Sequence, residues 1–189
     1  MSSELSVTQT PKREGGRPLW AALDVQYVDP RGYTGCVVAS DWGADTADEE
    51  RVYVHEPVAP YRSGFFYERE LPCLLGALAA GTALPQHIVV DGYVQLPKGR
   101  KGLGQHLHEA LDGKAAVIGV SKTLFRNDTA SIPVLRGESR QPLYVTALGI
   151  DVKAAATIIE QLHGRFRIPT LLKRVDRLAR DAVPPSYSP

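Results

Sequence analysis

The chain has 189 residues, of which 43% are hydrophobic and 23% are charged, and its net charge is +1. This length allows one domain with a sizeable core. The near-neutral charge excludes a protein coated with basic residues, so any site for a polyanion must be local. Two isolated cysteines, Cys36 and Cys73, give neither a zinc-ligand spacing nor a disulfide framework. No apolar run of transmembrane length and no signal peptide is recognisable, so we expect a cytoplasmic protein.

The first half of the chain predicts an antiparallel meander followed by a helix. Residues 1–17 are polar and aperiodic, and we expect them to form a disordered arm. Within segment 65–81 we expect a helix that begins near Pro72, which suits a first helical turn, and ends near Gly81. Three apolar segments joined by short connections predict antiparallel strands: 19–28, 33–42 and 51–58.

The second half of the chain alternates strands and helices. Residues 87–91 are a short apolar run that predicts a buried strand, parallel to the first strand by a right-handed crossover. A second strand is expected at 115–122, and segment 142–147 is either a further strand or one arm of a hairpin. Helices are expected at three further places: 102–111, 151–163 and 170–180. We expect a disordered tail at 182–189, which leaves residues 18–181 as a single domain.

The order β-β-β-α-β-α-β-α, with an antiparallel meander leading into parallel strands, is that of the RNase H-like fold. We therefore expect an α/β domain with a mixed five-stranded sheet flanked by helices. Metal-dependent nucleases of this fold carry carboxylates on the first strand, the following helix and the fourth strand. Asp24, Glu70 and Asp91 fall at these three places. Each acid alone would be a solvated strand end or helix start, but the three together favour a nuclease.

Several short motifs resemble those of the endonuclease V family. ALDVQY, ERELP and IVVDG contain the three acids and resemble the family's carboxylate motifs, and PYRSG resembles its wedge, Pro-Tyr-Ile-Pro-Gly. GVSK resembles the family's Gly-Val-Ala-Lys and supplies Lys122. PLYVTALG and RFRIPTLLKRVDRLAR resemble later segments of the family. The resemblance runs from about Leu19 to Arg180.

The resemblance implies a Mg²⁺- or Mn²⁺-dependent endonuclease that hydrolyses a phosphodiester near a deaminated base, inosine, in DNA or RNA. Such an enzyme serves DNA repair. Asp24 and Asp91 would bind the metal ion directly, since Mg²⁺ prefers carboxylate oxygens. Glu70 would complete the metal site, directly or through water. Lys122 would hold the scissile phosphate or stabilise the leaving oxygen.

Further residues are expected to contact nucleic acid. Tyr61 matches the wedge tyrosine, which separates the strands beside the altered base. Arg62 stands where the family has Ile, and we expect its charge to weaken strict lesion specificity. His106 is either a nucleic-acid contact or a packed histidine on a helix. Three basic residues are expected to meet phosphates: Lys98, Arg100 and Lys101.

The chain also departs from the family. The residues ahead of the first strand look too polar for the family's N-terminal helix. The histidine usual after Pro-Gly, near the last catalytic position, is absent, because the chain reads Gly149-Ile150-Asp151. Asp151 could serve as a fourth metal-site carboxylate or as the N-cap of the following helix. The two roles are compatible.

Two alternatives to an inosine-directed endonuclease stay open. The altered wedge and Asp151 suit a divergent nuclease of the same fold that acts on another nucleic acid. The other alternative is a non-catalytic nucleic-acid-binding module, although retention of three carboxylates and Lys122 counts against it. In each case we expect a monomer without a membrane partner.

Overall fold

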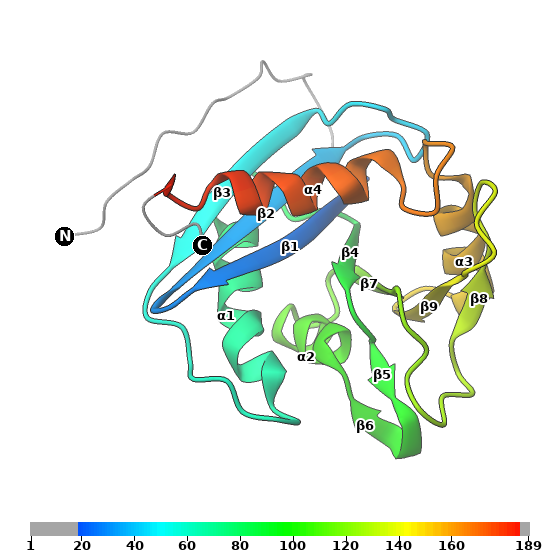
Figure 1. Ribbon diagram of the computed structural model, residues 1–189, viewed down its shortest axis with the longest axis horizontal. Helices are drawn as coiled ribbons and strands as arrows, with labels where there is room; N and C mark the ends of the chain where they lie inside the picture. The colour runs from blue at the N-terminus through cyan, green and yellow to red at the C-terminus, as the bar shows by residue number, and fades with distance from the viewer. Residues whose placement is uncertain (1–18, 186–189) are drawn as a thin grey trace.

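The computed structural model describes residues 19–185. The expected arm at 1–17, and the part of the expected tail beyond residue 185, lie outside the described residues. A single seven-stranded sheet forms the centre, and two helices cover each of its faces (Figure 1). No helix in the described range is both long and apolar enough to cross a bilayer.

The sheet confirms the expected mixed α/β fold and extends it. The first three strands form an antiparallel meander: β1 (Trp20–Val28), β2 (Arg31–Ala39) and β3 (Glu49–His55). Two central strands follow in parallel, first to β1 and then to each other: β4 (His87–Asp91) and β7 (Ala116–Ser121). The sheet order is β3-β2-β1-β4-β7-β9-β8.

The expected count of five strands is too low, because a hairpin adds two more at one edge. β9 (Leu143–Leu148) runs antiparallel to β7, and β8 (Ile132–Val134) pairs with β9. Segment 142–147 is thus a strand and a hairpin arm at once. The sequence did not indicate β8 because it has only three residues, including Pro133, within a polar stretch. A proline lacks the N–H that a central strand needs, and it is tolerated at this sheet edge.

The basic loop after β4 is also a hairpin. Two-residue strands, β5 (Gln95–Leu96) and β6 (Arg100–Lys101), pair antiparallel around a short 3₁₀ turn, Pro97–Gly99. Lys98 and Gly99 both have positive φ, at 65° and 69°. The basic residues therefore belong to a defined hairpin, β5–β6, which lies at the edge of the molecule (Figure 1).

Two helices pack on each face of the sheet. α1 (Phe66–Ala79) and α2 (Leu103–Ala110) share one core with Ala21 and Leu23 of β1. α3 (Val152–Gln161) and α4 (Thr170–Asp181) share the other core with Trp20 and Ala22. Successive side chains of a strand point to opposite faces, so residues 20–23 of β1 are buried from both sides. From Asp24 onward the strand is only partly buried, and its side chains can reach solvent.

Helix α1 begins earlier than expected. The sequence placed Pro72 in the first turn, but the helix starts at Phe66 and Pro72 lies in its middle, on the exposed side. A proline inside a helix removes one backbone hydrogen bond, which normally costs stability. Burial of Leu74 and Leu78 against the sheet outweighs that loss. The early start places Glu70 in the second turn, where it is buried.

Candidate active site

Two acids from adjacent strands lie side by side where the parallel strands β4 and β7 end, which we call the carboxyl edge of the sheet. Leu23 of β1 is paired with Val90 of β4, so the next residues, Asp24 and Asp91, lie side by side. Asp91 in turn is paired with Val120 of β7, two residues before Lys122. The Lys122 Nζ donates to the Asp91 Oδ2 over 2.9 Å. The structure therefore brings these three residues together, at the edge where open α/β sheets bind ligands.

Glu70 reaches the same place from helix α1. Its side chain is buried, and Oε2 has no hydrogen-bond partner among the described residues. Burial, and then the charges of Asp24 and Asp91, raise the pKa of Glu70 to about 8. An unpaired buried carboxylate is costly. A cation bound between these acids would remove that cost.

Opposing effects act on the pKa of Asp24. Burial, then the charges of Asp91 and Asp176, raise its pKa to about 6. The backbone N–H of Val25 donates to Asp24 Oδ1 over 2.9 Å, and this bond and Lys122 act in the opposite direction. The three acids chosen from the sequence are therefore close enough to perturb one another.

Asp176 is a fourth acid at this site, and sequence reasoning missed it. It lies on α4, which crosses β1 and β2, and its charge acts on both Asp24 and Lys122. Gly35, the partner of Asp24 in β2, allows this close crossing: a Cβ there would lie 2.7 Å from the Val175 carbonyl oxygen. The sequence held one indication of this position: Asp176 follows Val175, whose helical spacing predicts a side chain that faces the sheet.

Asp151 lies at the opposite edge of the sheet, so its expected role as a metal ligand is wrong. β9 runs antiparallel to β7, with Leu148 beside Val117, and the chain therefore leaves β9 where β7 begins. Lys122 follows the other end of β7. The Asp151 carboxylate accepts the backbone N–H groups of Lys153 and Ala154, each at 3.0 Å. The alternative role, an N-cap of α3, is confirmed.

The wedge segment is exposed and partly held in place. Tyr61 has 68% of its surface exposed, just before α1, and its ring lies 6.2 Å from that of Phe66. Arg62 pairs with Glu68 over 3.0 Å and covers the Phe65 ring at 4.5 Å. The charge that replaces the family's Ile is therefore engaged within the protein.

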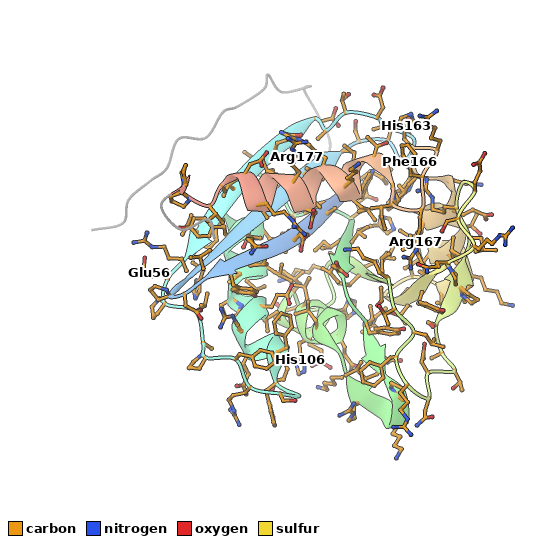
Figure 2. All side chains as sticks on the ribbon, in the orientation of Figure 1. Glu56, His106, His163, Phe166, Arg167 and Arg177 are labelled. Atoms are coloured by element: carbon orange, nitrogen blue, oxygen red, sulfur yellow. The ribbon has the colours of Figure 1, made fainter. Side chains whose placement is uncertain are left out.

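The expected nucleic-acid contacts on the hairpin and on α2 stand apart from the carboxylates. Lys98, Arg100 and Lys101 are exposed, and Lys101 pairs with Glu109 over 2.7 Å. The His106 ring stacks on Tyr67 of α1 at 3.7 Å, and burial lowers its pKa (Figure 2). His106 thus packs the two helices together, as the structural alternative for this residue predicted.

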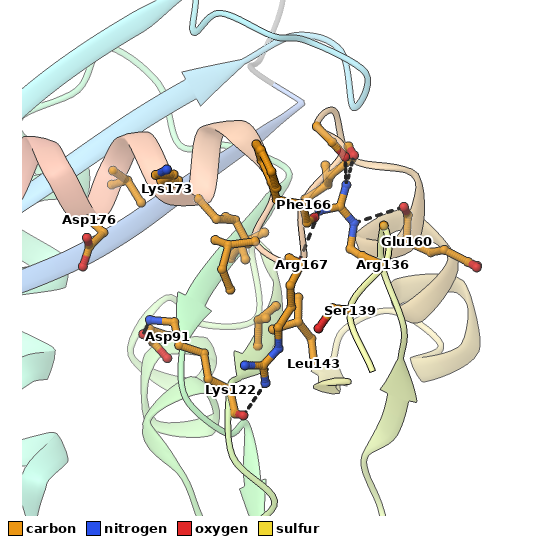
Figure 3. A pocket seen from close by; sticks show the side chains of 18 of the residues that line it. Asp91, Lys122, Arg136, Ser139, Leu143, Glu160, Phe166, Arg167, Lys173 and Asp176 are labelled. Atoms are coloured by element: carbon orange, nitrogen blue, oxygen red, sulfur yellow. Dashed lines mark hydrogen bonds and ion pairs between the residues drawn. The ribbon is translucent and has the colours of Figure 1, made fainter. Parts of the chain in front are cut away.

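A cavity of about 1180 Å³ adjoins the acids on the α3/α4 face. Asp24, Asp91, Lys122 and Asp176 line one side of it, and Figure 3 shows Lys122 reaching towards Asp91 there. The chain between α3 and α4 forms much of the opposite wall. The acids therefore lie between the exposed carboxyl edge of the sheet and this cavity.

The donor set suits a hard divalent cation. Among the described residues, no group of three acidic, histidine or cysteine side chains is placed so that it could hold a metal ion. Mg²⁺ does not require one, because it usually binds one or two carboxylates and keeps several waters. The unpartnered Oε2 of Glu70 and the mutual repulsion of Glu70, Asp24 and Asp91 are what such an ion would relieve.

The fold agrees with comparisons to known proteins. The model of a family described as Endonuclease V matches residues 1–177. The chain belongs to the endonuclease V family. The resemblance found in the motifs is thereby confirmed, over most of the length at which it was expected.

Individual members of the endonuclease V family differ in how much of their sequence they share with this chain. Endonuclease V of Rhodospirillum centenum is 34% identical over 142 residues, which cover 64% of this chain and 58% of that protein. The chain thus spans less than two thirds of that relative. The crystal structure of Endonuclease V from Streptomyces avermitilis is 30% identical, with a TM-score of 0.68, covering 89% of this chain and 83% of that one.

A third comparison concerns the fold alone. Endonuclease V of Ciona intestinalis, crystallised with a 24mer DNA containing an inosine followed by a ribo-adenosine, has a TM-score of 0.73 at 20% identity. It covers 87% of this chain and 85% of that one. The sheet and helices of this endonuclease V family member therefore match those of a relative bound to nucleic acid.

Proposed function

We propose that this chain is an endonuclease that hydrolyses a phosphodiester beside a deaminated base, inosine, in DNA or RNA. One observation carries the proposal: Asp24, Glu70 and Asp91 come from three separate elements and meet at one sheet edge, with a buried carboxylate oxygen left unpaired. Membership of the endonuclease V family supports the reaction class. The inosine-containing DNA bound by the Ciona relative supports the substrate.

Mg²⁺ or Mn²⁺ is the cofactor we propose. Asp24 and Asp91 would hold it directly, and Glu70 and Asp176 would complete the set directly or through water. Such an ion, when bound, supplies a Lewis acid for the phosphoryl oxygens and an activated water. This role for Asp176 replaces the one first considered for Asp151.

Lys122 is the residue we expect to hold the scissile phosphate. Burial acts to lower its pKa, but the hydrogen bond to Asp91 and the charges of Asp91, Asp24 and Asp176 outweigh burial and raise it. Lys122 therefore stays protonated, and its ammonium can donate to a phosphate or leaving oxygen. Its 2.9 Å contact with Asp91 keeps it beside the carboxylates.

The exposed aromatic and basic residues would bind the rest of the substrate. Tyr61 stands free enough to stack in the gap left by an extruded base. Arg62 would add a phosphate contact if it left Glu68. The hairpin residues Lys98, Arg100 and Lys101 are exposed beside α2 and would contact further phosphates.

A cleavage assay tests the proposal. Labelled oligonucleotides with one inosine, and matched ones without it, are incubated in DNA and RNA form with Mg²⁺, Mn²⁺ or EDTA. We expect nicking next to inosine with either metal and none in EDTA. Equal cutting of plain and inosine-containing strands would instead indicate a divergent nuclease with another substrate. Binding without cleavage in any metal would indicate a non-catalytic module.

A further inference from the structure

We infer that the cavity on the α3/α4 face binds one nucleotide of the substrate strand, on the side of the scissile phosphate away from Tyr61. We call it the flank cavity. It is defined by its walls: the carboxyl ends of β4 and β7, the start of α4, and two segments, 135–139 and 160–168. At about 1180 Å³ it exceeds the roughly 300–1000 Å³ usual for small-ligand pockets. This inference rests on the proposed function, because it assumes a nucleic-acid substrate.

The position of the flank cavity relative to the acids is the first argument. Asp24, Asp91, Lys122 and Asp176 all line it. A phosphate held at Lys122 therefore lies at the mouth of the cavity, and one neighbouring nucleotide must pass into it or over it. Tyr61 precedes α1, which packs on the other face of the sheet. The wedge and the flank cavity thus lie on opposite sides of the acids.

The apolar surface of the flank cavity suits a base. Its floor is made of buried side chains, among them Val89, Val120 and Leu143. Two large apolar residues at its walls are unusually exposed, Phe166 at 61% and Leu135 at 58%. Exposed aromatic rings in a groove beside phosphate-binding groups are typical stacking platforms for bases.

Two cations at the walls of the flank cavity suit a phosphate. Arg165 and Lys173 both line the cavity, and neither forms an ion pair with any residue that the structure describes. Figure 3 shows Lys173 on α4 above the cavity, one turn before Asp176. Two acids, Glu138 and Glu160, also line the cavity. Lys173 is thus free to meet a phosphate of the strand, whereas the Arg165 guanidinium lies over the Phe166 ring, 5.0 Å from its centroid, and would turn from it to do so.

The wall that carries Phe166 is held in place by a buried arginine. The Arg136 guanidinium is almost fully buried and donates to the carbonyl oxygens of Glu160, Leu162, Gly164, Phe166 and Arg167 (Figure 3). Arg167 extends this bracing, because its guanidinium donates to the carbonyls of Lys122 and Pro142. The cavity is therefore preformed, which lowers the entropic cost of binding.

Truncated oligonucleotides test the inference. Binding of labelled strands, with and without inosine, is measured by fluorescence anisotropy in the cleavage-deficient Asp91→Ala background. Two series of strands are shortened to the scissile linkage from the 5′ or from the 3′ side. We expect Phe166→Ala to weaken binding of the full-length strand about tenfold, the effect of losing one stacked base. In one truncated series, and only one, that penalty should vanish.

Matched charge variants provide a second measurement. Lys173→Glu should weaken binding and reduce the dependence of affinity on salt by about one phosphate contact. Lys153→Glu is the control, since Lys153 is exposed on α3 beside Asp151, at the opposite edge of the sheet. It should bind like the parent protein. Thermal unfolding of each variant checks that the fold is intact.

Two results would overturn the inference: no penalty for Phe166→Ala with any strand, or the same penalty in both truncated series. The first means that the cavity is unused, and the second means that Phe166 acts only through the fold. Failure of the wild-type chain to nick inosine-containing strands would overturn the proposed function instead. The binding series remains informative in that case, because it includes plain strands.

Discussion

The acids at the two ends of the central parallel strands, β4 and β7, have opposite surroundings. At the edge where β7 begins, Asp151 is exposed and its Oδ1 accepts two backbone N–H groups of α3. At the edge where β4 ends, Glu70 is buried with one oxygen unpaired, beside two further acids that raise its pKa. The first arrangement stabilises a helix, whereas the second costs stability until something else binds.

The difference teaches how to separate a structural acid from a functional one. Glu70 lies in a motif that resembles the family and Asp151 lies where the chain departs from it, yet either could be a metal ligand from sequence alone. Only the partners of each carboxylate distinguish them. An exposed acid that caps a helix stabilises the fold as it stands, while a buried acid repelled by its neighbours would be stabilised by a cation.

The largest expected effect is that of removing Asp91. Asp91→Ala deletes a proposed metal ligand and frees Lys122 from its partner. Because a metal ion contributes several kcal/mol to the stability of a phosphoryl-transfer transition state, nicking should fall roughly a thousandfold. Binding of an inosine-containing strand should change little. Nicking at more than a tenth of the wild-type rate would show that the metal site is assigned wrongly.

The next largest effect concerns Asp176, the acid that the sequence did not reveal. Asp176→Asn should lower the nicking rate roughly ten- to a hundredfold, as for a residue that tunes a metal site. The matched control is Asp151→Asn at the other edge, which should nick at the wild-type rate. Equal rates for the two variants, or the reverse order, would contradict the contrast between the edges.

A third effect appears in stability rather than in activity. The pKa of Glu70 is raised to about 8 in the folded protein, so its contribution to stability is full below its unfolded pKa and is lost as pH rises towards 8. The metal-free chain should therefore lose stability between about pH 5 and pH 8. Glu70→Gln should be more stable than wild type at pH 8 by at least about 1 kcal/mol.

Urea denaturation in EDTA at several pH values measures this difference for Glu70. Added Mg²⁺ at pH 8 should then stabilise the wild-type chain more than Glu70→Gln, because ligand binding to the folded state raises its stability. If the stabilities of the two proteins changed with pH in parallel, Glu70 would not be the source of the destabilisation proposed for this edge.

The smallest effect is expected at the capped edge. Asp151→Ala removes the N-cap of α3 and should lower the free energy of unfolding by about 1 kcal/mol. The loss should not depend on Mg²⁺, since Asp151 has no part in the proposed metal site. Thermal or urea unfolding with and without the ion measures it, and a Mg²⁺-dependent loss would link the two edges after all.

The sequence predicted the order of the main elements and three of the clustered acids, because apolar periodicity and strand ends are local features. It could not predict β8, whose pairing depends on β9 rather than on its own three residues. Pro72 misplaced the start of α1 because packing of the helix overrides a local preference. Asp151 was misplaced for a related reason: the direction of β9 carries it away from the other acids, and that direction is set by pairing.

Gly35 shows how far the chemistry depends on an absent side chain. A methyl group at this position would meet the backbone of α4, and the helix would have to move outward from the strand that carries Asp24. Asp176 would move with it. A change from glycine to alanine, which alters neither charge nor polarity, would thus pull apart two acids that it never touches.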